Sequence, residues 1–173
     1  LARHWQPGEP NGRGVLDSFL LAPLLHYLQD RDHPQVNGTS RLAPYLHFGE
    51  LSPRRVWQLV HERFSTDGDP QHARAAEGFL RQLVWREFAY YILQHFPQTP
   101  TQPSNEQFAR FPWRRDARAM QAWQQGRTGY PMVDAGMRQL LETGWMHNRL
   151  RMIVASFLDR KSTRLNSSHL GIS

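Results

Sequence analysis

A short run of small and polar residues, Gly38-Thr39-Ser40-Arg41, stands just before an expected helix. Small residues let backbone N–H groups approach an anion, while two hydroxyls and a guanidinium add hydrogen-bond donors. The start of the following helix would also favour negative charge. The same residues would serve as an ordinary Thr/Ser cap of that helix, and from these residues alone we prefer the cap.

A second candidate site lies within the longest periodic stretch. Gln82, Trp85 and Arg86 stand at i, i+3 and i+4, so they share one helix face. An amide, a large ring and a guanidinium on one face suit a pocket for a planar ligand. The alternative is a core tryptophan beside a surface Arg86–Glu87 pair, and the residues alone favour that alternative.

A third candidate site opens the last expected helix, where Asn148, Arg151 and Met152 fall on one face. Asparagine can read the edge of a heterocycle, and arginine can hold a phosphate or a planar ring. A capped helix with solvated arginines explains these residues equally well.

Composition excludes several function classes. The chain has no cysteine, which removes disulfides, thiolate metal sites and a cysteine nucleophile, and fits a cytoplasmic protein. His26, His47 and His147 have no metal-ligand spacing, and no Ser–His–acid set or GxGxxG motif is evident. No apolar run approaches the roughly 20 residues of a membrane helix. The net charge of +6 points weakly to a nucleic-acid partner, and we expect a monomer.

The elements that would position these residues are all helical, because no stretch shows sustained period-two alternation. The first twelve residues are rich in Gly and Pro and predict an entry loop. Ser52 predicts an N-cap with Pro53 at the first helical position, and Asp116 predicts another cap. The expected helices are 16–28 with a kink at Pro23, 53–64, 73–96, 116–123 closed by Gly126, 131–141 closed by Gly144, and 147–158.

Several motifs, in order, resemble the DNA photolyase and cryptochrome family. They are the run 37–53 (NGTSRLAPYLHFGELSP), Trp85-Arg-Glu-Phe88, the stretch from Ala122-Trp-Gln through Gly129-Tyr-Pro to Val133-Asp-Ala, and 143–152 (TGWMHNRLRM). One motif alone would be weak, whereas their shared order makes coincidence implausible. The resemblance implies the helical domain that holds FAD in a bent shape: an all-α multi-helix bundle, here truncated.

The resemblance implies FAD contacts at specific positions. Residue 27, a tyrosine, would contact the cofactor, and residue 79, a phenylalanine, stands where the family commonly has tryptophan. The residues implied to cradle the pyrophosphate are Thr39, Ser40, Arg41, Leu42 and Ala43, and those implied to line the flavin pocket are Gln82, Arg86, Trp145, Asn148 and Arg151.

Damaged DNA is the partner that the resemblance implies. Arg31 would reach a DNA phosphate, and Trp85, Met152 and Gln82 would lie toward the flipped lesion. Trp113 would be the outermost of three tryptophans that pass an electron to the flavin. We therefore expect Trp113, Trp85, Asn148 and Met152 to serve the reaction.

The implied reaction is light-driven electron transfer from reduced flavin to a cyclobutane pyrimidine dimer, which splits the dimer. Gln82 stands where many such enzymes have Glu and resembles (6-4) photolyases, but Asn148 and Met152 stand where (6-4) enzymes carry two histidines. Cyclobutane-dimer repair is therefore preferred over (6-4) repair. A blue-light cryptochrome without repair activity, and a basic helical DNA-binding module without flavin, are the other hypotheses.

The sequence changes character at Asp159. Residues 159–173 (DRKSTRLNSSHLGIS) are serine-rich and poor in apolar side chains, so we expect a foreign or disordered tail after a partial FAD-binding domain at 1–158. The family's acidic motif facing the flavin and two relay tryptophans would lie past that point. We expect Ile153, Val154 and Phe157 to lack partners, and the fragment to be inactive and to bind FAD poorly.

Overall fold

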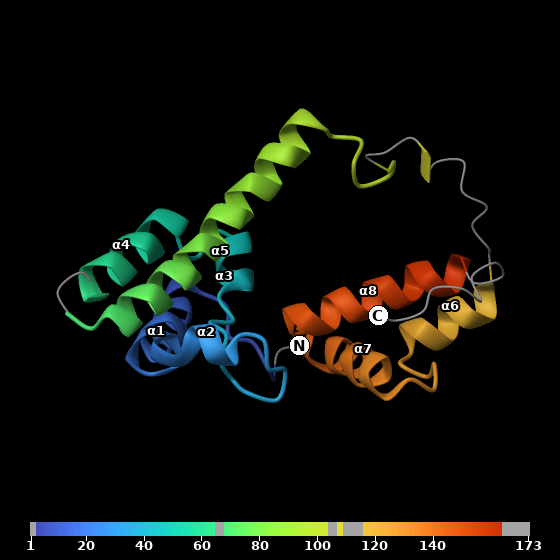
Figure 1. The fold of residues 1–173 in the computed structure, drawn as a ribbon, viewed down its shortest axis with the longest axis horizontal. Helices are drawn as coiled ribbons and strands as arrows, with labels where there is room; N and C mark the ends of the chain where they lie inside the picture. The colour runs from blue at the N-terminus through green and yellow to red at the C-terminus, as the bar shows by residue number, and fades with distance from the viewer. Residues whose placement is uncertain (1–2, 65–67, 104–106, 109–115, 164–173) are drawn as a thin grey trace. The chain divides into compact units, whose positions relative to one another are not determined.

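The structure is a computed structural model that describes residues 3–64, 68–103, 107–108 and 116–163, without the side chains of the final five (Figure 1). Internal contacts divide the chain into two compact units, Ala2–Thr101 and Gln102–Ser173, called here the N-terminal and C-terminal units. Each is described by itself. The described residues contain helices and no strand, which confirms the all-α prediction.

The N-terminal unit holds most of the helices. In chain order they are α1 (Glu9–Leu21), the 3-10 turn η1 (Pro23–His26), α2 (Tyr27–Asp30), α3 (Ala43–His47), α4 (Pro53–Phe64) and α5 (Pro70–His95). The C-terminal unit holds α6 (Ala117–Gln124), α7 (Pro131–Thr143) and α8 (Asn148–Thr163).

Local signals fix where most helices begin and end. Pro53 and Pro131 open α4 and α7 as predicted. Asp116 caps α6, its carboxylate accepting from the Ala119 N–H at 3.0 Å. Helix α5 begins three residues before the predicted Ala73, because Asp69 caps it by accepting from the Gln71 N–H at 2.7 Å.

The start of the chain differs from the prediction. Helix α1 begins at Glu9, inside the expected entry loop, because Pro10 is compatible with a first helical turn. Gly12 is buried in this helix, where a Cβ would stand 2.9 Å from Tyr45 Cδ1, so close packing explains a glycine there. Helix α1 also ends at Leu21, so the kink predicted at Pro23 is a complete break into η1 and α2.

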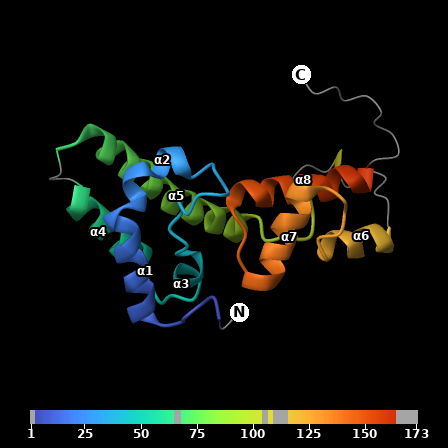
Figure 2. The ribbon, with the colours of Figure 1, turned by 90° about the horizontal axis from the view of Figure 1, so that it is seen from below.

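Helix α5 forms the centre of the N-terminal unit and packs against η1, α2 and α4 (Figures 1 and 2). Only its first half enters the core, which is built from apolar side chains of every helix in this unit. The core members are Leu16, Phe19, Leu20, Leu24, Tyr27, Leu42, Tyr45, Leu46, Leu51, Val56, Val60, Phe64, Ala76, Phe79, Leu80 and Leu83.

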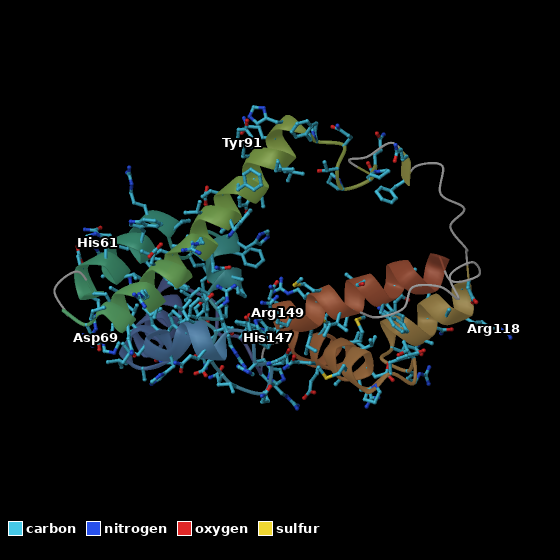
Figure 3. All side chains as sticks on the ribbon, in the orientation of Figure 1. His61, Asp69, Tyr91, Arg118, His147 and Arg149 are labelled. Atoms are coloured by element: carbon cyan, nitrogen blue, oxygen red, sulfur yellow. The ribbon has the colours of Figure 1, made fainter. Side chains whose placement is uncertain are left out.

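The second half of α5 is rich in exposed aromatic side chains. Trp85 meets Phe88 edge to face, Phe88 stacks on Tyr91, and Tyr91 lies 4.2 Å from His95 between ring centroids. Tyr91 is labelled on this projecting part of α5 in Figure 3. These rings support one another along the helix rather than through the core of the unit.

The C-terminal unit has a small core of its own, formed by Val133, Met137, Met146, Leu150 and Val154. Helix α6 joins it through the Trp123 indole N–H, which donates to the Val154 carbonyl at 3.1 Å.

The end of the chain also differs from expectation. Val154 is buried and the Phe157 ring lies 4.8 Å from that of Tyr130, so the prediction that both lack partners is wrong; Ile153 is exposed. Helix α8 continues to Thr163, five residues past the expected boundary at Leu158. The foreign origin of residues 159–173 stays a prediction.

Candidate cofactor site

The Gly38–Arg41 run forms a tight loop against the end of α2. A Cβ on Gly38 would stand 2.3 Å from the Asp30 Cβ, so only glycine lets the loop approach this closely. Arg41 has a φ of 53°, the only positive φ among the described non-glycine residues. The structure therefore holds this loop in a specific, sterically demanding conformation.

Ser40 does not cap the next helix. Helix α3 starts after Leu42 with no side-chain cap, and the Ser40 hydroxyl instead accepts from the Leu42 N–H at 3.4 Å. The Thr/Ser-cap interpretation preferred from the residues is thus wrong. A hydroxyl that accepts one hydrogen bond keeps its proton to donate, so Ser40 retains a donor for an anion.

Tyr27 lies within an aromatic cluster. Its ring makes edge contacts with Phe19 and Phe79 at centroid distances of 6.0 and 5.7 Å, and the Arg31 guanidinium lies 5.3 Å from its centroid. Burial raises the pKa of the Tyr27 phenol, the Arg31 charge lowers it and Asp32 raises it, with a net upward shift. The phenol is therefore neutral at physiological pH and available as a hydrogen-bond donor.

Arg86 is held from three sides. Its Nη2 donates to the Leu46 carbonyl at 3.2 Å, its Nη1 pairs with the Glu87 carboxylate, and its guanidinium lies 4.7 Å from the Tyr90 ring centroid. The Leu46 carbonyl belongs to the last turn of α3, where carbonyls have no partner within the helix. Arg86 thus joins α5 to the end of α3 and presents a planar cation in a fixed orientation.

Gln82 lies one turn before Arg86, its amide donating to the Gly78 carbonyl at 3.1 Å. Trp85 is 60% exposed, so the interpretation of a core tryptophan is wrong, although the Arg86–Glu87 pair of that interpretation is present. The α5 face therefore offers an amide, a clamped guanidinium and an open indole.

The N-terminal unit brings several of the predicted positions close to one another. The Gly38 loop rests on α2, α2 carries Tyr27, and Tyr27 contacts Phe79 on α5. Leu42 and Phe79 are buried in the core, so any contact of Leu42 with a cofactor would come from its backbone.

In the C-terminal unit, Arg151 and Met152 occupy the first turns of α8. The Arg151 Nε donates to the Met146 carbonyl at 3.0 Å, and the Met152 sulfur lies 3.8 Å from an Arg149 nitrogen. Met152 is 55% exposed and Asn148 is exposed at the start of the helix. Both side chains are open to a ligand.

His147 positions the start of α8 (Figure 3). It is 1% exposed, its Nδ1 accepts from the Arg149 N–H at 3.2 Å, and the half-buried Trp145 lies 6.2 Å away between ring centroids. Burial and a hydrogen bond from the backbone are typical of a histidine that stabilises the fold. A shared pocket between Ser40, Arg86 and Asn148 stays a prediction, because Asn148 belongs to the C-terminal unit and the other two residues to the N-terminal unit. Trp113 lies outside the described residues.

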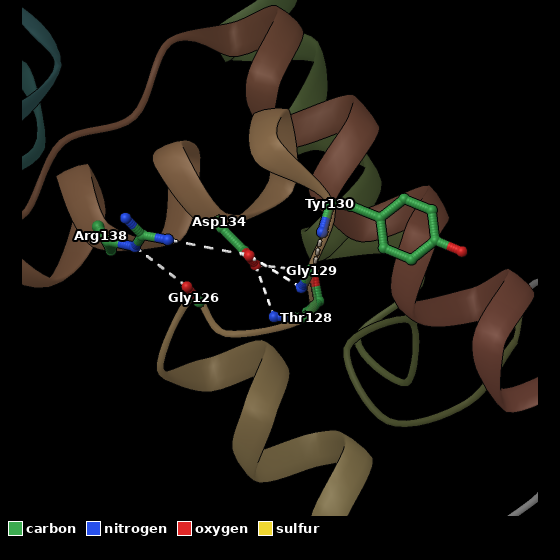
Figure 4. A network of polar contacts seen from close by, with 6 residues as sticks. All are labelled: Gly126, Thr128, Gly129, Tyr130, Asp134 and Arg138. Carbon is green, nitrogen blue, oxygen red and sulfur yellow. Dashed lines mark hydrogen bonds and ion pairs between the residues drawn. The ribbon is translucent and has the colours of Figure 1, made fainter.

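The sequence interpretation missed a buried carboxylate, that of Asp134 in the first turn of α7, which faces the turn between α6 and α7 (Figure 4). One oxygen of Asp134 accepts from the Thr128 N–H and hydroxyl, both at 2.7 Å, and the other accepts from the Gly129 N–H at 3.0 Å. The Arg138 guanidinium lies 3.9 Å away. Burial acts to raise the pKa of Asp134, but these hydrogen bonds and Arg138 outweigh it, so the pKa is lowered. An acidic residue in the first turn of a helix was the available signal.

Comparison with known proteins identifies the domain. The sequence pattern that defines the FAD binding domain of DNA photolyase matches residues 79–166. The chain belongs to the DNA photolyase and cryptochrome family. A deoxyribodipyrimidine photo-lyase of Agrobacterium fabrum is 46% identical over 156 residues, which cover 89% of this chain and 31% of that protein. Cryptochrome-2 of Arabidopsis thaliana is 44% identical over 160 residues, 91% of this chain and 26% of that protein.

Solved structures agree with this assignment. A crystal structure of a bacterial class III photolyase from Agrobacterium tumefaciens superposes with a TM-score of 0.82 at 43% identity, over 94% of this chain and 33% of that one. A Synechocystis cryptochrome gives the same TM-score at 31% identity, over 90% of this chain and 32% of that one. This chain thus spans about a third or less of the length of these relatives, and its cofactor is FAD.

The described residues fit that cofactor chemically. Ser40 and Arg41 could supply donors and positive charge for a pyrophosphate, and Gln82 and the clamped Arg86 carry planar polar groups that suit a ring. Among the described residues, no group of three or more His, Asp or Glu side chains could hold a metal ion. In the same part of the chain, no helix is both long and apolar enough to span a bilayer.

Proposed function

We propose that the intact protein containing this chain is an FAD-dependent photolyase that splits cyclobutane pyrimidine dimers under blue light. The observation that carries the proposal is the open indole of Trp85, 60% exposed on the same helix face as Gln82 and the clamped Arg86. A lesion base needs an exposed ring on which to stack, and a flavin needs fixed polar groups beside it.

The chain's own residues would bind and orient, and the cofactor would supply the electron chemistry once reduced and excited by light. The Gly38–Arg41 loop would hold the pyrophosphate, and Arg86 would keep its orientation through the Leu46 carbonyl. Asn148 and Met152, both exposed on α8, would contact the lesion. Arg31 would contact a DNA phosphate, its side chain shared between Asp32 at 3.6 Å and the Tyr27 ring.

The test is repair of a defined cyclobutane-dimer oligonucleotide by the flavin-loaded intact protein under blue light. Repair that requires light supports the proposal, and reduced, bound flavin without any repair would sink it. Trp85→Ala should weaken binding of dimer-containing DNA by about fivefold or more, since stacking on one base contributes about 1–3 kcal/mol. Tyr91→Ala is the matched control, an exposed aromatic change on the same helix that should leave this affinity unchanged.

A second candidate function is that of a cryptochrome photoreceptor without repair activity, which the similarity to Arabidopsis Cryptochrome-2 supports. The same titrations separate the two functions. A photolyase should prefer dimer-containing over intact DNA, whereas a photoreceptor should bind flavin, respond to light and show no such preference.

A further inference from the structure

Helices α4 and α5 leave an apolar groove between them in the N-terminal unit. Its volume is about 430 Å³. The apolar lining comes mainly from Trp57, Val60, Phe64, Ala73, Leu80 and Val84. Gln82 and Arg86 of the candidate cofactor site do not line it, so the groove is a separate feature of α5.

The groove is an open trough rather than an enclosed pocket. Trp57 and Val84 at its mouth are 42% and 54% exposed, whereas small-molecule sites bury most of their ligand. Its α5 side runs from Ala73 to Val84, about 16 Å at the helical rise per residue. That length matches three turns of an α-helix, and an apolar trough of this kind accepts the apolar face of an amphipathic helix. The exposed indole of Trp57 would be its aromatic anchor.

Positive charge borders the groove. Arg54 stands one turn before Trp57 on α4, and Arg74 stands one turn before Glu77 on α5. Residues one turn apart share a helix face, so each arginine lies on the same face as a residue that lines the groove. Within the described ranges neither guanidinium makes an ion pair or a hydrogen bond, whereas Glu77 is already paired with Arg81 at 3.0 Å. The uncompensated rim charge is therefore positive, and it is complementary to carboxylates.

We propose that the groove between α4 and α5 docks an acidic amphipathic helix of a partner protein. Leucine-like side chains of that helix enter the trough beside Trp57, and its flanking carboxylates meet Arg54 and Arg74. This surface adds a protein-binding function to the chain that does not depend on DNA or on FAD.

The test uses the flavin-loaded intact protein and a synthetic fluorescein-labelled peptide. The peptide forms three to four helical turns, with leucines at i, i+3, i+4 and i+7 and glutamates on both flanks; its control carries lysine in place of each glutamate. Anisotropy should show saturable binding of the acidic peptide only. Arg54→Glu with Arg74→Glu should weaken this binding by about tenfold, because each exposed ion pair contributes only a few-fold.

Two controls keep the test specific. Arg63→Glu makes the same charge change on α4 away from the groove and should leave the affinity unchanged. Ala73→Trp fills the trough from an exposed position and should abolish binding without unfolding the domain, as checked by circular dichroism. The proposal is overturned if both peptides bind equally well or if Arg63→Glu weakens binding as much as the double variant does. It is also overturned if acrylamide cannot quench Trp57 fluorescence, because another part of the intact protein would then cover the groove.

Discussion

The turn between α6 and α7 allows a paired test of steric packing. Gly126 and Gly129 both have positive φ, 61° and 83°, which side chains disfavour. A Cβ on Gly126 would stand 2.7 Å from the Asp134 carbonyl oxygen and 2.9 Å from the Arg138 Cγ, whereas a Cβ on Gly129 meets nothing within 4 Å. Alanine at the two positions therefore shares the backbone strain and differs in the clash.

The expected free-energy costs follow from that difference. Left-handed backbone costs an alanine about 1–2 kcal/mol, which is the whole effect of Gly129→Ala. Gly126→Ala adds about 1–3 kcal/mol for overpacking, because the Asp134 carbonyl that its Cβ would meet is part of the helix backbone and cannot move aside as a flexible side chain can. We expect Gly126→Ala to destabilise the C-terminal unit by at least ~1 kcal/mol more than Gly129→Ala does.

Urea unfolding followed by tryptophan fluorescence measures the free energy of unfolding of both variants. Native-state hydrogen exchange at the amides of residues 128 and 129 reports on the turn itself, because both amides donate to Asp134. Gly126→Ala should speed exchange at these amides more than Gly129→Ala. Free energies of unfolding that agree within about 0.5 kcal/mol would refute the clash as a distinct contribution.

Three further predictions follow from the same geometry. Phe79→Ala should destabilise the N-terminal unit by about 3–5 kcal/mol in urea unfolding, because it empties the space beside Tyr27; a Tyr27→Phe control keeps the ring and should cost far less. Asp134→Asn should make stability less sensitive to acid. The pKa of Asp134 is lower in the folded than in the unfolded chain, so its carboxylate stabilises the fold at pH values above the unfolded pKa near 4, and this stabilisation is lost as pH falls through the folded pKa. An unchanged acid-unfolding midpoint would contradict it. Arg86→Lys should reduce FAD retention by the intact protein roughly tenfold, read from flavin absorbance after gel filtration, since a lysine cannot hold both the Leu46 carbonyl and Glu87; full retention would show that the clamp is dispensable.

Local signals made most of the fold predictable. Pro53, Pro131 and Asp116 act on the helix that they start, and Gly144, with a φ of 72°, closes α7 as expected. The same local logic failed at the first helix, where a proline and glycines indicated a loop. The burial of Gly12 against Tyr45 joins positions 33 residues apart, and no local pattern shows that contact.

The candidate site shows the same division. Helical spacing correctly places Gln82 and Arg86 on one face, but it does not show that Arg86 donates to Leu46, 40 residues earlier. Trp85 illustrates a different limit, because tryptophan packs in cores and also serves at binding surfaces, so only the structure shows its exposure. For Asp134 the hydrogen-bond partners lie just five and six residues before it, yet the turn that brings them back has no strong signature of its own.

The Arg86–Leu46 bond has a mechanical consequence. Helix α3 begins two residues after the Gly38–Arg41 loop and is only five residues long, so the loop and the Leu46 carbonyl lie at opposite ends of one short helix. If the loop shifts when it binds an anion, α3 would shift the Leu46 carbonyl, and with it the Arg86 guanidinium on the same α5 face as Gln82 and Trp85. Occupancy at one end of the cofactor would in this way be felt at the face where a substrate base arrives.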